Sequence, residues 1–91
     1  MKTFVIEREI PGASKLTTDQ LKGIAVKSCQ VVENLHVPYT WITSYVAGDK
    51  IYCIHEAENA EDIYRHAREG GFPADRVTEV AAMIGPQTAT A

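Results

Sequence analysis

The 91-residue sequence contains no apolar run near the roughly 20 residues of a membrane-spanning helix. Residues 1–8 are too short and too charged to supply the apolar stretch of a signal peptide. The two cysteines, Cys29 and Cys53, are too few for a disulfide framework, and their spacing matches no zinc knuckle. These absences predict a cytoplasmic protein with no membrane as its partner.

Basic charge is also scarce. Nine lysines and arginines stand against twelve acidic residues, which leaves a net charge of −3, and no basic run or stripe occurs. A nucleic-acid-binding surface needs a concentration of positive charge, so no nucleic acid is expected as a partner. The content of 45% hydrophobic and 23% charged residues is instead typical of a globular chain. The length predicts a single domain over residues 1–91.

Hydrophobic periodicity divides the chain into four strands and two helices. The strands alternate between apolar and polar residues or are rich in aromatic and β-branched side chains, and the helices show apolar residues at helical spacing. Gly48-Asp49 is a two-residue hairpin signal between the second and third strands. The predicted strands are residues 3–9, 39–46, 51–56 and 76–84, and the predicted helices are residues 19–35 and 60–69.

The order strand, helix, strand, strand, helix, strand is that of a ferredoxin-like sandwich, and right-handed crossovers leave few alternatives. The sequence therefore predicts an α+β fold with a four-stranded antiparallel sheet. Its strands should lie in the order fourth, first, third, second, with both helices on one face. An uncovered sheet face is a large loss for so short a chain, which favours pairing with a second copy.

The hairpin loop decides which side chains share a face of this sheet. A two-residue loop places Tyr45 opposite Tyr52 and Trp41 opposite Glu56, because residues opposite each other on paired strands lie on the same face. The aromatic trio Trp41, Tyr45 and Tyr52 would then line the uncovered face, with His55 beneath the helices. A three-residue loop would reverse the two faces.

Two carboxylates are predicted on the same uncovered face. If Phe4 and Val80 face the helices, Glu7 and Glu79 lie on the open side, roughly in one row with the tyrosines. Two solvated carboxylates on a half-exposed sheet and a polar site inside a dimer cavity are both compatible with that placement.

The sequence has no standard metal or catalytic signature: it lacks an HExxH motif, a nucleophile elbow and a glycine-rich phosphate loop, so it does not indicate an enzyme. His66 follows Asp62 by four residues, which suits either a carboxylate that orients a ligand ring or a plain surface contact. His55 and Glu56 are strand neighbours whose side chains point to opposite faces. Cys53 is predicted to be a packed residue rather than a nucleophile, because no basic residue stands next to it in sequence.

Several segments are distinctive when taken together. They are residues 41–46 followed by 49–53, and the segments 7–12, 65–67, 71–74 and 77–80. This pattern resembles a family of small bacterial proteins, long catalogued as a domain of unknown function and now often labelled nickel-binding proteins. The resemblance covers nearly the whole chain and implies a ferredoxin-like fold, a homodimer and binding of nickel or a similar divalent metal. The matching residues that would serve a metal are Glu7, Tyr45, Asp49, Cys53 and His66.

The leading hypothesis is a non-catalytic homodimer that binds nickel or a similar divalent metal, for which imidazole and carboxylate oxygen are suitable ligands. The residues expected to hold the metal are Glu7, Glu79, His55 and His66. The alternative is an enzyme or small-molecule binder of the dimeric α/β-barrel kind, in which two sheets enclose an aromatic cavity. The residues expected to line that cavity are Trp41, Tyr45 and Tyr52.

Overall fold

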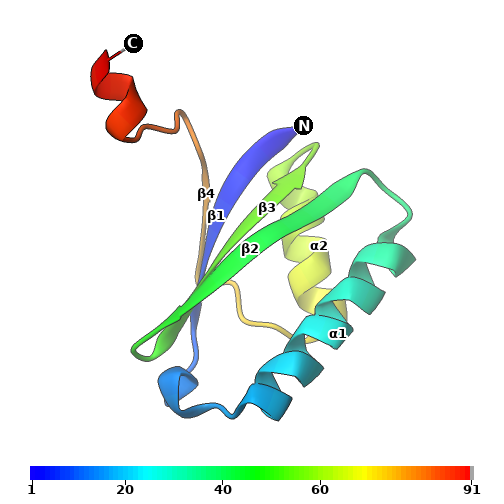
Figure 1. Ribbon diagram of the computed structural model, residues 1–91. Coiled ribbons are helices and arrows are strands. Elements are labelled where there is room, and N and C mark those ends of the chain that lie inside the picture. The colour runs from blue at the N-terminus through cyan, green and yellow to red at the C-terminus, as the bar shows by residue number, and fades with distance from the viewer. Residues whose placement is uncertain (91) are drawn as a thin grey trace.

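A computed structural model describes residues 1–90 and shows four strands and two α-helices in the predicted order. The elements are β1 (Lys2–Glu9), α1 (Thr18–Leu35), β2 (Tyr39–Ala47), β3 (Lys50–Ala57), α2 (Ala60–Gly70) and β4 (Arg76–Glu79), with short 3-10 helices η1 (Ala13–Lys15) and η2 (Pro86–Thr90). The antiparallel sheet has the strand order β2-β3-β1-β4. Both helices lie on the same side of this sheet (Figure 1), so the predicted ferredoxin-like sandwich is confirmed.

Local signals define the ends of both helices. The Thr17 side chain accepts a hydrogen bond from the Gln20 N–H while the Gln20 side chain accepts one from the Thr17 N–H, which is a capping box at the start of α1. α1 ends at Leu35, and the next residue, His36, takes a left-handed conformation with φ 55°. The Asn59 side chain caps the first turn of α2, and Gly71 closes that helix with φ 69°.

The core lies between the sheet and the two helices. Alternate residues of β1 and β3 are buried, since successive side chains of a strand point to opposite faces. The buried apolar side chains from the strands and helices include Phe4, Ile6, Ile51, Cys53, Val31, Leu35 and Ile63. Among residues 1–90, no helix combines the length and the hydrophobicity needed to cross a membrane.

The hairpin between β2 and β3 has the predicted two-residue loop. Gly48 and Asp49 form its tip, and Gly48 takes a positive φ of 59°, which a glycine adopts without steric cost. Tyr45 lies opposite Tyr52, as the loop length predicted. The tip is held against the loop after β1, because the Ile10 N–H donates to the Asp49 carbonyl at 2.8 Å.

A β-bulge changes the rest of that hairpin. Ile42 is an extra residue in β2, so Trp41 pairs with His55 and not with Glu56. One inserted residue moves the side chains before it to the other face of the sheet. The placement of Trp41 on the uncovered face was therefore wrong, and Trp41 lies beneath the helices.

The last strand is shorter than predicted and its alternation is shifted by one residue. Val77 packs against the core, so Glu79 lies opposite Phe4 on the helix side of the sheet. The expectation that Glu79 shares the open face with Glu7 was therefore wrong. β4 ends at Glu79, the Val80 N–H still donates to the Thr3 carbonyl at 2.8 Å, and Ile84 further on is 83% exposed.

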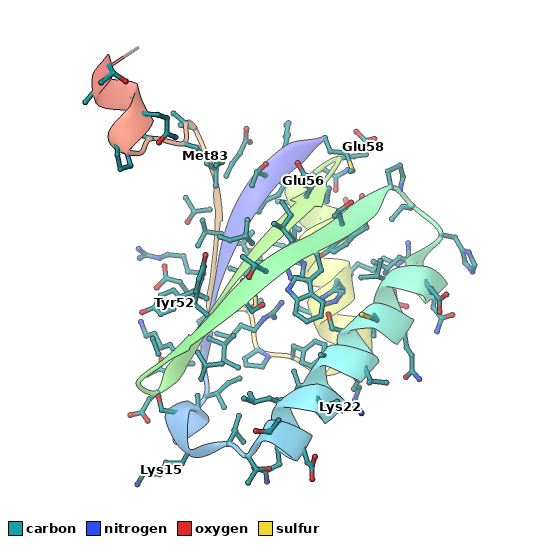
Figure 2. All side chains as sticks on the ribbon, in the orientation of Figure 1. Lys15, Lys22, Tyr52, Glu56, Glu58 and Met83 are labelled. Carbon is teal, nitrogen blue, oxygen red and sulfur yellow. The ribbon has the colours of Figure 1, made fainter. Side chains whose placement is uncertain are left out.

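The opposite face of the sheet carries no helix among the described residues (Figure 1). Tyr52 points away from the helices on this side (Figure 2). Val5 and Ile54 lie opposite each other near its centre, and Glu7 lies opposite Tyr52. We call this surface, made by Val5, Glu7, Tyr45, Tyr52 and Ile54, the open face.

Candidate functional site

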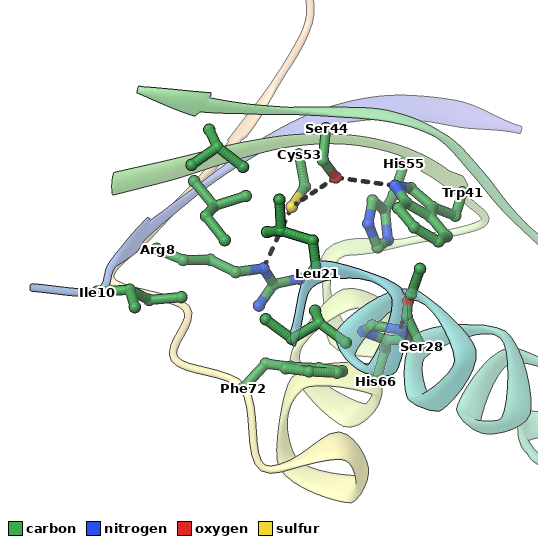
Figure 3. Close-up of a pocket in the computed structure, with 14 residues that line it drawn as sticks. Arg8, Ile10, Leu21, Ser28, Trp41, Ser44, Cys53, His55, His66 and Phe72 are labelled. Atoms are coloured by element: carbon green, nitrogen blue, oxygen red, sulfur yellow. Dashed lines mark hydrogen bonds between the residues drawn. The ribbon is translucent and has the colours of Figure 1, made fainter. Parts of the chain in front are cut away.

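A cavity of about 270 Å³ lies between the sheet and the first half of α1 (Figure 3). Leu21, Ile24 and Ala25 of α1 form its helical wall, and each of them is only half-buried. Val31 and Leu35, further along the same apolar stripe, are buried. The second half of α1 therefore packs onto the core, while its first turns stand away from the sheet and leave room between them.

The sheet side of the cavity carries a chain of hydrogen bonds that ends on one sulfur atom (Figure 3). Trp41 Nε1 donates to Ser44 Oγ at 2.9 Å, and Ser44 Oγ donates to Cys53 Sγ at 3.0 Å. Arg8 Nε donates to the same Sγ at 3.3 Å. The sequence suggested no basic partner for Cys53, but the pairing of β1 with β3 brings Arg8 to it from 45 residues away.

Arg8 is a charged residue of this site that the sequence analysis did not single out. Its side chain is 4% exposed, its Nη1 donates to the Pro73 carbonyl at 2.5 Å, and its Cζ lies 5.5 Å from the centre of the Phe72 ring. None of the ion pairs within residues 1–90 involves Arg8. The available signal was the alternation of β1, which puts Arg8 on the same side as Phe4 and Ile6, an unusual place for a charge.

Two histidines and their aromatic neighbours form the inner end of the cavity. The His66 ring is stacked between Tyr39 and Phe72, with centroids 5.3 and 5.6 Å away, and the His55 ring meets it edge-on at 5.1 Å. His55 Nδ1 is hydrogen-bonded to the Tyr39 hydroxyl at 2.5 Å, and His66 Nε2 to Ser28 Oγ at 3.1 Å. His66 Nδ1 is buried and has no hydrogen-bond partner among the described residues.

These rings are uncharged at neutral pH. Burial, followed by the charges of His66 and Arg8, lowers the pKa of His55 from 6.5 to about 3. Burial, followed by the charge of Arg8, lowers the pKa of His66 to about 4, although Ser28 acts in the opposite direction. Burial also raises the pKa of Tyr39. Arg8 is thus the charged group at the centre of a neutral, largely apolar site.

The structure divides the four residues that were expected to hold a metal. His55 and His66 come together beneath the helices, with their ring centroids 5.1 Å apart. Glu7 lies on the open face, where its carboxylate is 3.6 Å from the ammonium group of Lys50. Glu79 lies at the outer edge on the helix side. Two imidazoles are therefore brought together and the two carboxylates are not.

A nickel ion does not fit the donor groups of one chain. Within residues 1–90, no three histidine, cysteine, aspartate or glutamate side chains converge as metal ligands would. His55 and His66 have each committed one ring nitrogen, and the adjacent Arg8 charge repels a cation. Asp49 accepts a hydrogen bond from the Gly12 N–H at 2.9 Å, so it holds the hairpin tip in place.

The aromatic residues expected in the alternative site are also divided. Trp41 lines the cavity beneath the helices, whereas Tyr45 and Tyr52 remain on the open face. Tyr45 is 62% exposed, which leaves its ring available to a partner. The bulge at Ile42 is the cause of this division, because it reverses the orientation of Trp41 alone among the three.

The fold and the site define a small ferredoxin-like protein with a cavity on the helix side of its sheet and an uncovered face on the other. A family model described as nickel responsive protein SCO4226-like matches residues 4–80, and the chain belongs to this family. The predicted resemblance to a family of small proteins associated with nickel is therefore confirmed.

A solved structure supports the same assignment. The chain is similar to the crystal structure of SCO4226 from Streptomyces coelicolor A3(2), with a TM-score of 0.74 and 25% sequence identity. The match covers 90% of this chain and 99% of that one. No curated protein matches the chain at a significant level.

Proposed function

We propose that this protein acts in the cellular response to nickel as a non-catalytic homodimer, with a divalent ion held by ligands from two copies. The observation that carries the proposal is the match to a nickel-responsive family over residues 4–80. The free thiols Cys29 and Cys53 suit a reducing cytoplasm as the place of action.

The open face supports the homodimer. Val5 and Ile54 occupy its centre, and Tyr45 is 62% exposed on β2. Beyond β4, Met83 and Ile84 are 89% and 83% exposed. Exposed apolar side chains of this kind favour an interaction surface, and a second copy that packs on the open face would bury Val5, Tyr45 and Ile54 in both chains at once.

The separation of the donor groups supports a site completed by two chains. On the open side, Glu7, Glu9 and Asp75 line a polar hollow together with Lys50 and Arg76. These carboxylates do not form a metal site by themselves, since Glu7 faces Lys50 and the Asp75 carboxylate accepts a hydrogen bond from the Glu9 N–H at 2.6 Å. A symmetric partner would bring a second Glu7 to the shared face, and carboxylate oxygen is a ligand that nickel accepts.

Calorimetric titration of the metal-free protein with nickel at neutral pH, combined with sedimentation analysis, tests this proposal. We expect measurable heat, a rise in melting temperature with nickel, and a dimer as the species that binds. Copper should compete, because it stands above nickel in the affinity order of such ligands.

A pair of glutamate variants locates the site. Glu7→Gln should weaken nickel binding by about tenfold or more, because a carboxylate ligand is lost. Glu58→Gln is the matched control, since Glu58 is exposed outside the open face and should leave the titration unchanged. Absence of both heat and stabilisation in the wild-type protein would contradict the proposal, and equal effects of the two variants would contradict the site.

A further inference from the structure

We propose that the cavity between α1 and the sheet binds a small organic anion, a carboxylate with an apolar body, whose charged end pairs with Arg8. This inference does not depend on metal binding, because the cavity and the open face lie on opposite sides of the sheet. It rests on an unpaired buried charge and on the size and lining of the cavity.

The charge of Arg8 is the first observation. A buried cation is stable when an anion or a full set of hydrogen bonds replaces its water. Arg8 has neither: within residues 1–90 no ion pair includes it, and its two acceptors are the Pro73 carbonyl and the Cys53 sulfur, of which the sulfur is a weak acceptor. Nη2 makes no hydrogen bond to the described residues, and Arg8 lines the cavity.

The planar guanidinium group of Arg8 suits a carboxylate. Its five N–H donors form a fork that matches the two oxygens of a carboxylate. Nε and Nη1 are already held by Cys53 and Pro73, and the Phe72 ring lies 5.5 Å from Cζ. The guanidinium group is therefore held in place before any ligand arrives, so binding of an anion costs little of the side-chain entropy of Arg8.

The rest of the cavity is apolar and suits the body of such a ligand. Leu21, Ile24 and Ala25 line the helical side, and Trp41 and Ile51 line the sheet side. These walls offer contact area to an aryl or a branched alkyl group, while Arg8 lies in the sheet-side wall (Figure 3). A recess with apolar walls and a few polar groups in defined places is the usual form of a small-molecule site.

The volume sets the size of the ligand. An engineered cavity of about 150 Å³ in another protein holds benzene, so 270 Å³ accommodates a body with roughly ten non-hydrogen atoms. Phenylacetate and hexanoate are of this order. The half-buried first turns of α1 form one side of the recess, so a ligand enters without displacing the packed end of the helix around Val31 and Leu35.

The charges around the cavity exclude a cation. The protein as a whole carries a net charge of −3, yet the described groups that line this cavity include one cation and no carboxylate. His55 and His66 are neutral and add no negative charge. An amine or a metal ion would meet the Arg8 charge in a low-dielectric site, whereas an anion would be attracted by it.

The fluorescence of Trp41 supplies the test, because it is the one tryptophan in the sequence and it lines the cavity. The probes are benzoate, phenylacetate and hexanoate, each compared with its neutral amide, and phenethylamine as a cation. We expect a saturable change in Trp41 emission with at least one carboxylate, and binding about tenfold or more tighter than that of its amide. Phenethylamine should bind most weakly.

Variants place the ligand. Arg8→Gln should remove the preference for the carboxylate over its amide while the amide still binds. Ile24→Phe should weaken binding, because the larger side chain narrows the recess, and Val26→Phe is its matched control, because Val26 lies on the same helix, is 49% exposed and does not line the cavity. The Ile24 and Val26 pair decides the location even if Arg8→Gln does not fold.

Three results would overturn the inference. The first is no saturable Trp41 response to any of the carboxylates. The second is equal affinity for a carboxylate and its amide in the wild-type protein, which would remove the role of the Arg8 charge. The third is unchanged binding in Ile24→Phe, which would place the ligand elsewhere.

Discussion

The Tyr39 hydroxyl lies 2.5 Å from His55 Nδ1, in a part of the core where Tyr39 is 9% exposed and His55 is 1% exposed. Both groups are neutral at pH 7, since burial raises the pKa of Tyr39 and lowers the pKa of His55 to about 3. The bond links the first residue of β2 to β3, and the two rings also meet edge-on with centroids 5.3 Å apart. It therefore fixes the His55 ring at the inner end of the cavity.

Removal of this hydroxyl should destabilise the protein. Tyr39→Phe keeps the ring that stacks on His66 but leaves His55 Nδ1 buried without a partner, so we expect the free energy of unfolding to fall by about 1–3 kcal/mol. Urea unfolding followed by circular dichroism measures the change. Tyr64→Phe is the control, because Tyr64 is 42% exposed, and it should change stability by less than about 0.5 kcal/mol. Equal losses in the two variants would show that the bond contributes nothing.

Stability should depend on pH through the two buried histidines. Their pKa values in the folded protein, about 3 for His55 and about 4 for His66, lie below the ordinary value of 6.5. The unfolded chain therefore takes up protons first as the pH falls, and the stabilisation that is fully present above pH 6.5 is lost towards pH 4. Each histidine contributes a slope approaching 1.4 kcal/mol per pH unit, as an order of magnitude.

Urea unfolding between about pH 6.5 and pH 5 measures this slope above the range in which most carboxyl groups titrate. His66→Gln should reduce the slope, because one of the two proton-linked groups is then absent. Ring-proton NMR signals of His55 and His66 should stay constant in the folded protein over the same range. A titration of either ring near pH 6.5 would contradict the prediction.

The open face should control assembly. Ile54→Lys introduces a charge beside Val5 at the centre of that face, and burial of an unpaired ammonium group is unfavourable. We expect the dissociation constant of the dimer to rise by about tenfold or more, with an unchanged circular dichroism spectrum. Sedimentation velocity over a range of protein concentrations measures it.

Tyr64→Lys on α2 is the matched control for this substitution, because Tyr64 is exposed on the other side of the molecule. It should leave the assembly state unchanged. A monomeric wild-type protein, or an Ile54→Lys variant that still forms the dimer with the same affinity, would contradict the role of the open face.

Two glycines should respond in opposite directions to alanine. Gly23 lies inside α1 with nothing within 4 Å of an added Cβ, so Gly23→Ala should stabilise the protein by about 0.5–1 kcal/mol. Gly70 lies against the Phe72 ring, which an added Cβ would displace from its stacking on His66. Gly70→Ala should destabilise the protein by about 1–3 kcal/mol. Thermal and urea unfolding of both variants measure these changes in stability. A loss of stability in Gly23→Ala would contradict the absence of neighbours around an added Cβ at Gly23.

One part of the β2–β3 hairpin follows from the local sequence, and another part does not. The loop at Gly48-Asp49 and the pairing of Tyr45 with Tyr52 follow from local turn chemistry, and both were predicted. The bulge at Ile42 carries no such signal, because its residue types fit an ordinary strand. It moves Trp41 from the expected open face into the cavity.

The prediction for the last strand was wrong for a related reason. Alternation in residues 76–84 is compatible with either phase, so the choice between them needs the partner strand. β1 pairs with only four residues of the predicted strand, Arg76–Glu79, and Val77 takes the position facing the core. Glu79 follows on the same side, and the expected row of carboxylates with Glu7 does not form.

The sequence by itself determined the order and type of the elements and the two-residue hairpin, because caps, turns and hydrophobic periods act within a few neighbouring residues. Its motif pattern also indicated the family. Only the tertiary structure decided which polar groups meet. Arg8 reaches Cys53 through the pairing of β1 with β3, and His55 reaches His66 through the packing of α2 on the sheet. Contacts across such distances depend on strand register and on the fit between layers, and no local pattern records either.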